Sequence, residues 1–246
     1  MKYVVIFFLF ALSLVGVQAQ DTSMIKKAKK DWSKVNLANI SKDHFLIQLG
    51  YGPWTQKPDS INTKGIPFSF NFYLMMAFPF PGNKRYSVAI GAGVGTDDQY
   101  FDKTYVDVSG QNSRKLTFTD VSDTTHFKKT KLKTTYLDAP VELRFSSNPE
   151  RPLKSWKGAL GFKVGYLVGA GTKSKELQNS KNNTINDYTL KERSKRYFNN
   201  TRLCVTGRVG FGIISLYGSY QVNTFVKDGS GPDMRPLQFG ITFSGL

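Results

Sequence analysis

The chain has 246 residues, a formal net charge of +16 and one cysteine, Cys204. A single cysteine excludes an intramolecular disulfide, so an exported domain of this length takes its stability from a large core or from a membrane. The basic residues do not follow one helix, which argues against a nucleic-acid-binding protein and favours attraction to an anionic surface.

The N-terminus predicts export. Residues 1–19 have a lysine at position 2, an apolar run over residues 3–16 and small residues at the end, which is typical of a secretory signal peptide. The apolar run is too short for a spanning helix, which needs about 20 apolar residues. We predict a basic periplasmic segment over residues 20–42 and one domain over residues 43–246.

Large apolar side chains then alternate with small or polar ones in eight segments. In FSFNFYLMMAF, residues 68–78, Phe68, Phe70 and Phe72 begin the apolar face, and Ser69 lies between the first two. A period of two predicts β-strands with two unlike faces. The predicted strands are residues 44–51, 68–78, 85–95, 134–145, 159–171, 201–211, 213–223 and 236–243.

The connections between these strands alternate in length. Outer-membrane barrels have short periplasmic turns and longer external loops, and about 11 tilted residues cross their apolar band of about 25 Å. We therefore predict an all-β, eight-stranded antiparallel up-and-down transmembrane β-barrel with both ends in the periplasm. The predicted external connections are residues 52–66, 96–133, 172–200 and 224–235, and the predicted turns are 79–84, 146–158 and 211–213.

The face opposite the apolar one combines glycines with charged side chains. An eight-stranded barrel is just wide enough for side chains to fill it, so its interior residues are small and its charges pair. A soluble, lipocalin-like barrel is the alternative, but its glycines would lie on the solvated outside, where they only weaken strands. We predict a structural lumenal polar network of Glu142, Arg144, Lys163, Arg202 and Arg208.

One stretch is more specific. The strand YLDAPVELRF is followed by a turn and the glycine-alternating strand GALGFKVGYLVGAG. This combination resembles the PorT-like outer membrane β-barrel family, over the whole chain from residue 44 to the last strand. The resemblance implies an integral outer-membrane protein; the family's namesake belongs to a protein secretion and gliding apparatus, but membership does not transfer that role. The matching residues are Tyr136, Asp138, Pro140, Leu143, Arg144 and Phe145.

Pro140 departs from the usual pattern of a central strand. Proline has no amide hydrogen for the sheet ladder and normally avoids such positions. We predict either a β-bulge at Pro140 or an unpaired site that faces the lumen.

Two groups could carry chemistry. His126 lies near Ser122 in the longest connection, as a lipid-modifying enzyme would require, but this spacing is commonplace in polar loops. Asp97, Asp98 and Asp102 could chelate a hard cation, but their spacing matches no calcium loop, so we predict a solvated acidic loop. We predict no catalytic residue, no metal and no cofactor.

The longer connections are basic. Clustered cations attract anionic head groups, and generic solvation of the loops is the alternative. The predicted contacts to lipopolysaccharide phosphates are Lys173, Lys175, Lys191, Arg193, Lys195 and Arg196, with Lys128, Lys129, Lys131 and Lys133 also facing the outer leaflet.

The predicted function is a non-enzymatic one. We expect a monomeric outer-membrane barrel that acts as an envelope scaffold, in adhesion, or as a secretion or assembly partner of an unidentified envelope protein. The alternatives are a lipid-modifying outer-membrane enzyme, a soluble periplasmic lipid-binding barrel and a small pore.

Overall fold

A computed structural model of the chain describes residues 45–110 and 113–244. The predicted signal peptide, residues 1–19, and the predicted periplasmic segment, residues 20–42, lie outside the described residues. Within them, no helix is long and apolar enough to cross a membrane.

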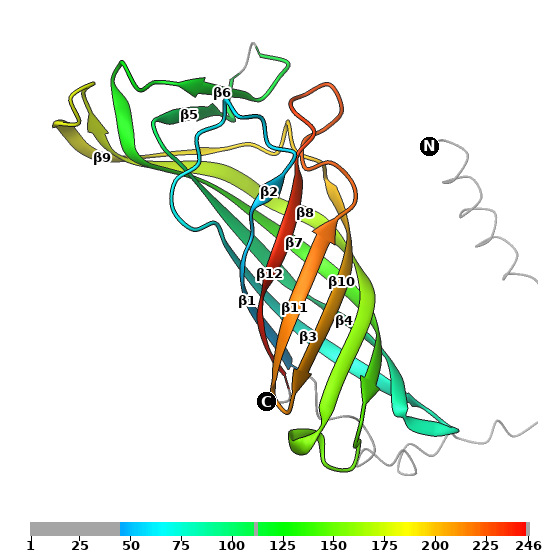
Figure 1. Cartoon of the computed structure of the whole chain (residues 1–246). Helices are drawn as coiled ribbons and strands as arrows, with labels where there is room; N and C mark the ends of the chain where they lie inside the picture. Colours follow the sequence, from blue (N-terminus) through cyan, green and yellow to red (C-terminus); the bar gives the residue numbers. More distant parts are fainter. Residues whose placement is uncertain (1–44, 111–112, 245–246) are drawn as a thin grey trace, which may run out of the picture. The chain divides into compact units, whose positions relative to one another are not determined.

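Eight antiparallel strands close into a barrel (Figure 1). Each pairs with the next, and the first pairs with the last through contacts such as Leu49↔Ile241, so closure leaves no open edge in the barrel. The predicted eight-stranded up-and-down fold is confirmed. The barrel strands are β1 (Phe45–Tyr51), β3 (Phe68–Phe80), β4 (Asn83–Phe101), β7 (His126–Ser146), β8 (Trp156–Gln178), β10 (Thr201–Phe211), β11 (Ile214–Gln221) and β12 (Arg235–Ser244).

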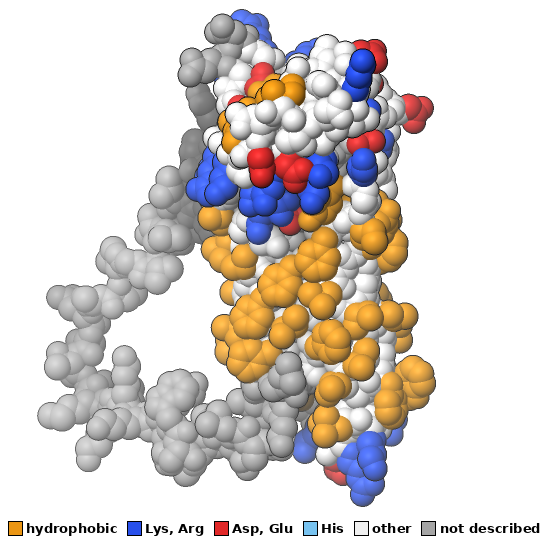
Figure 2. All heavy atoms as spheres, turned by 90° about the vertical axis from the view of Figure 1, so that its left-hand side faces the viewer, with side chains coloured by type: hydrophobic (Ala, Val, Ile, Leu, Met, Phe, Trp, Pro, Cys, Tyr) orange, Lys and Arg blue, Asp and Glu red, His pale blue; other side chains and the backbone are white. Residues whose placement is uncertain are grey.

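The two faces of the strands divide as the alternation predicts. On β3, Met76 is 61% exposed, whereas Ser69 and Asn71 are fully buried at 0%. The outward side chains form an apolar belt around the barrel (Figure 2). A transmembrane barrel presents such a band to lipid, and the lipocalin-like alternative is wrong because it would turn these side chains inward. The apolar belt consists of Phe45, Leu49, Phe68, Phe70, Leu74, Met76, Phe78, Ile90, Val94, Leu137, Leu143, Leu160, Phe162, Val164, Val168, Leu203, Val205, Val209, Leu216, Phe239 and Ile241.

Three strands run well beyond their predicted ends. β4 has 19 residues, β7 has 21 and β8 has 23. The predicted connections over residues 96–133 and 172–200 are therefore largely strand, because they pair with each other outside the belt. β9 (Thr184–Arg193) pairs with β8, and the end of β4 pairs with β7 as far as Phe101↔Thr130, so β9 and the ends of β4, β7 and β8 form an external sheet.

The remaining elements are short. β5 (Thr104–Asp107) and β6 (Thr117–Asp120) form a hairpin, and β2 (Trp54–Thr55) pairs with β12. A 3₁₀ turn, Pro152–Lys154, lies in the connection between β7 and β8.

A hydrophobic cluster lies where the long connections meet the external ends of the strands. Trp54 packs against Phe101 and Phe225, with ring centroids 5.9 and 5.2 Å apart, and Phe225 packs against Phe198. These connections are thus packed together over one end of the barrel. This mouth cluster contains Trp54, Ile61, Phe101, Val106, Val108, Leu116, Phe118, Leu132, Tyr136, Leu167, Ala170, Tyr197, Phe198, Phe225, Val226 and Met234.

Pro140 faces the lumen without a bulge. The ladder between β4 and β7 passes from Ile90↔Val141 to Gly93↔Asp138 with no change of register. The ladder to β4 is interrupted opposite Pro140, whereas on the other side Pro140 keeps its register with Lys163 of β8, so the residue is lumenal and unpaired on one side only.

The mouth cluster should carry measurable stability. We expect Phe225→Ala to lower the free energy of unfolding by about 3–5 kcal/mol, because it removes a packed aromatic ring from a buried cluster. Urea unfolding of the protein in lipid vesicles measures the change. Ile185→Ala is the control, since this side chain is 58% exposed on β9, away from both the mouth cluster and the apolar belt. An equal loss in both variants would contradict the role given to the cluster.

Candidate functional site: the lumen and the external sheet

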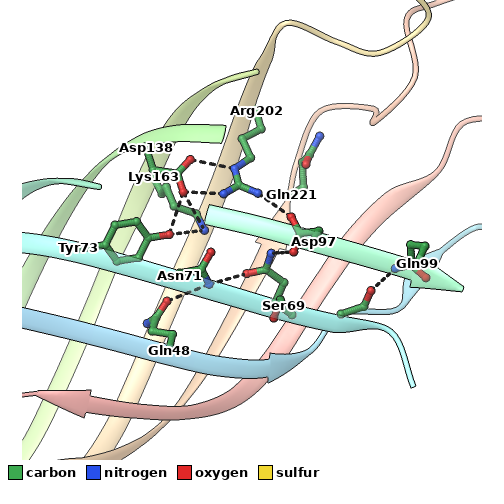
Figure 3. Close-up of polar contacts among 12 residues, drawn as sticks. Gln48, Ser69, Asn71, Tyr73, Asp97, Gln99, Asp138, Lys163, Arg202 and Gln221 are labelled. Carbon is green, nitrogen blue, oxygen red and sulfur yellow. Dashed lines mark hydrogen bonds and ion pairs between the residues drawn. The ribbon is translucent and has the colours of Figure 1, made fainter. Parts of the chain in front are cut away.

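The centre of the lumen is a charged cluster around Arg202 of β10, which is 1% exposed (Figure 3). Its Nε and Nη2 donate hydrogen bonds to the two carboxylate oxygens of Asp138 at 2.9 and 2.5 Å. Its Nη1 donates to Asp97 at 2.9 Å, and the guanidinium carbon lies 4.1 Å from the ring centroid of Tyr136. One arginine is thus held between two carboxylates and an aromatic face.

Lys163 of β8 completes this cluster. Its Nζ donates to the hydroxyl of Tyr73 at 3.1 Å and lies 3.8 Å from the carboxylate of Asp138. The Tyr73 hydroxyl in turn donates to Asp138 at 2.8 Å. Arg202 and Lys163 balance Asp97 and Asp138, so the buried cluster is neutral, as the cost of burying an unpaired charge requires.

A row of amide side chains connects this cluster to the strands that close the barrel (Figure 3). Gln238 of β12 donates to Asp97 at 2.6 Å. Asn71 of β3 donates to both Gln238 and Gln48, each at 3.3 Å, and Gln48 of β1 donates to Thr242 at 3.2 Å. The polar network therefore crosses the seam between β1 and β12.

A second ionic group lies elsewhere in the lumen. Glu142 accepts a hydrogen bond from Nε of Arg144 at 2.8 Å and one from Nη2 of Arg208 at 3.2 Å. All three side chains are buried. The structure therefore places the five predicted lumenal residues in two groups, with Arg202 and Lys163 in the first and Glu142, Arg144 and Arg208 in the second.

Side chains fill the lumen. Two cavities within it measure about 10 and 20 Å³, each close to the space that one water needs. A methyl group in place of either Gly95 or Gly165 would collide with Arg202 or Asp138, so glycine makes room for the cluster. A larger groove of about 610 Å³ lies on the lipid-facing surface, lined by residues that include Leu143, Leu160 and Gly207.

The comparisons with known proteins agree with this architecture. A family model described as outer membrane protein beta-barrel domain matches residues 35–245. The chain belongs to this family. The match extends over the whole described barrel, so the protein is an outer-membrane barrel. The comparison with curated proteins gave no significant match.

Asp97 corrects one prediction for this outer-membrane barrel. It was expected in a solvated acidic loop, but β4 continues through it and turns its carboxylate into the lumen. Asp98 faces the other way and pairs with Lys131 at 2.7 Å, and Asp102 pairs with Lys64 at 2.9 Å. Across the described residues, no group of three or more His, Cys, Asp and Glu side chains is arranged to hold a metal ion.

His126 lies at the external end of β7, and its two ring nitrogens contact residues other than Ser122. Its Nδ1 is 3.0 Å from the carbonyl oxygen of Thr124, and its Nε2 is 3.2 Å from the side-chain oxygen of Asn182. The backbone amide of Ser122 donates to Asp120. These contacts fit a histidine that fastens a strand end.

The predicted lipopolysaccharide contacts lie in three places. Lys173, Lys175, Lys191 and Arg193 lie on the external sheet of the outer-membrane barrel. The Lys195 ammonium lies 5.9 Å from the ring centroid of Tyr166. Arg196 is elsewhere, because its guanidinium donates to the carbonyl oxygen of Gly110 at 3.3 Å.

The Arg202 cluster predicts a large cost for removing its central cation. Arg202→Met leaves Asp97 and Asp138 without their buried partner, and we expect a loss of about 3–5 kcal/mol in the free energy of unfolding. Urea unfolding in lipid vesicles gives the value. Lys64→Met, which breaks the exposed pair with Asp102, should cost at most about 1 kcal/mol. If Arg202→Met were as stable as the unsubstituted chain, the cluster would not hold the barrel together.

Proposed function

We propose that this chain is a non-conducting, non-enzymatic and monomeric outer-membrane barrel whose role lies in the structures it presents outside the membrane. The observation that carries this proposal is the filled lumen. A barrel with a filled lumen can serve as a membrane anchor. This is the use that an envelope scaffold, an adhesion protein, or a secretion or assembly partner would make of it.

Two barriers in series support the absence of conduction. The first is the neutral cluster of Arg202, Lys163, Asp97 and Asp138, whose groups are already paired and offer no free charge to a passing ion. The second is the mouth cluster, which packs apolar side chains over the external end. An ion would have to displace both, and each is held by contacts from several strands.

The contacts of His126 support a non-enzymatic role. A lipid-modifying enzyme would need this imidazole beside a nucleophile, whereas its two nitrogens lie against Thr124 and Asn182. Two aspects of the proposal rest on sequence alone. The PorT-like affiliation comes from the resemblance around Asp138 and Pro140, and a protein partner in secretion or assembly is what that resemblance would imply.

Conductance tests the proposal directly. We expect the full chain, reconstituted in a planar bilayer in 1 M salt, to give no current steps, because the lumenal cavities are too small for a hydrated ion. Insertion is verified separately by protection of the barrel from protease in vesicles of the same lipid. Regular current steps from inserted protein would make the small-pore alternative correct.

Catalysis is tested on the lipid itself. We expect lipid A incubated with the folded chain in detergent micelles to keep its acyl chains, as followed by mass spectrometry. His126→Ala and Ser122→Ala should give the same result as the unsubstituted chain. A change in acylation that disappears in either variant would establish the enzyme alternative.

A further inference from the structure

The outer face of the external sheet carries a concentrated set of cations. Three strands contribute, and their register places the side chains in neighbouring rows. Lys131, Lys173 and Lys191 lie side by side across β7, β8 and β9, and Lys129 lies opposite Lys175. Arg193 is next to Gly171, which lies opposite Lys133. We call these residues the basic ladder: Lys129, Lys131, Lys133, Lys173, Lys175, Lys191 and Arg193.

The cations of the ladder are confined to one face of the sheet. In the same rows, the opposite face carries Thr130, Leu132, Thr172, Ser174, Leu190 and Glu192. Lys128, nearer the tip of the sheet, is paired with Glu176 at 2.6 Å. That opposite face is buried over the mouth of the barrel at Thr130, Leu132, Thr172 and Ser174, so the cations gather on the face that stays accessible to lipid head groups.

The protein leaves most of this charge uncompensated. Lys131 pairs with Asp98 at 2.7 Å, and in the part of the chain that the structure describes the other ladder residues form no ion pair. Like charges directly opposite one another destabilise a sheet. The neighbouring charge of Lys175, followed by smaller effects of desolvation and of Lys191, lowers the pKa of Lys173. An external anion would relieve this repulsion.

The ladder begins where the apolar belt ends. The last belt residues are Leu137 on β7 and Val168 on β8, which are 54% and 55% exposed. Lys133 is four residues beyond Leu137, roughly 13 Å along a tilted strand. Figure 2 shows Lys and Arg side chains gathered directly above the belt. In the outer leaflet, this is the depth at which lipid head groups meet the water.

We propose that the basic ladder binds the phosphate groups of a phosphorylated glycolipid of the outer leaflet, a lipopolysaccharide of the lipid A type. Its acyl chains would lie along the apolar belt of β7 and β8. Lys195, above the Tyr166 ring at the rim of the belt, adds a cation at the edge of this site. The proposal takes its orientation from the proposed function, in which the long connections lie outside the cell.

Binding of defined lipids tests the site. The full chain, folded in detergent micelles, is mixed with phosphorylated lipid A, dephosphorylated lipid A or phosphatidylglycerol, and native mass spectrometry gives the fraction that carries each lipid. We expect phosphorylated lipid A to be retained best. Lys173→Gln/Lys175→Gln/Lys191→Gln should weaken its binding by about tenfold or more, since each lysine near an anionic surface contributes about fivefold.

Two further variants separate charge from folding. Lys173→Arg/Lys175→Arg/Lys191→Arg keeps the cations and should keep the binding. Lys84→Gln/Arg85→Gln/Lys154→Gln removes three exposed cations from the opposite end of the barrel and should also bind normally. Equal losses in the two glutamine variants, or equal binding of dephosphorylated lipid A or phosphatidylglycerol, would overturn the proposal. Conductance does not depend on the ladder, so the two proposals fail separately.

Discussion

Arg202, held between Asp97 and Asp138, is the interaction on which the interior of this barrel depends. It joins β10 to β7 and to β4, and β10 is adjacent to neither of these strands in the sheet. The amides of Gln238, Asn71 and Gln48 extend the connection to the closing seam. A buried ion pair contributes little net stability relative to an apolar core, but it tolerates few alternative arrangements. The cluster therefore links strands that face one another across the lumen.

The composition of the surrounding strands follows from this cluster. Gly95 and Gly165 flank Arg202 where any larger residue would collide with it, so these glycines belong to the site. The usual order of a soluble protein is inverted here, with polar side chains inside and the apolar belt outside. Buried apolar side chains gather in two places: a small lumenal cluster that includes Leu46, Met75 and Ala89, and the mouth cluster beyond the belt.

The period of two in the sequence predicted the eight strands and the outward orientation of alternate side chains such as those from Phe68 to Phe78. Lipid on one side of a strand requires apolar side chains, and a narrow lumen on the other requires small or paired polar ones. The same alternation correctly predicted that Arg202 and Lys163 face the lumen. It failed beyond the belt, because in the KTKLKTT stretch of β7 the outward side chains are lysines and the buried ones are mostly threonines, so no apolar face marks the strand. Beyond Val94 the outward residues of β4, Thr96 and Asp98, are polar, so the pattern predicts a loop at Asp97, although Asp97 continues the inward row of Gly95.

A β-bulge on β8 separates the part of the strand that lines the lumen from the part in the external sheet. The period of two in the sequence does not reveal this bulge. Thr135 of β7 pairs with Gly169 and Tyr136 pairs with Leu167, so Val168 is an extra residue. A bulge puts two consecutive residues on one face and reverses the alternation beyond it. Below Val168 the even-numbered residues of β8 face lipid and Lys163 faces Asp138; above it Lys173 and Lys175 face outward. Without the extra residue, these two lysines would point over the mouth of the barrel, on the face where Thr130 and Leu132 are buried. One inserted residue thus lets a single strand supply a cation to the interior and further cations to the outer surface.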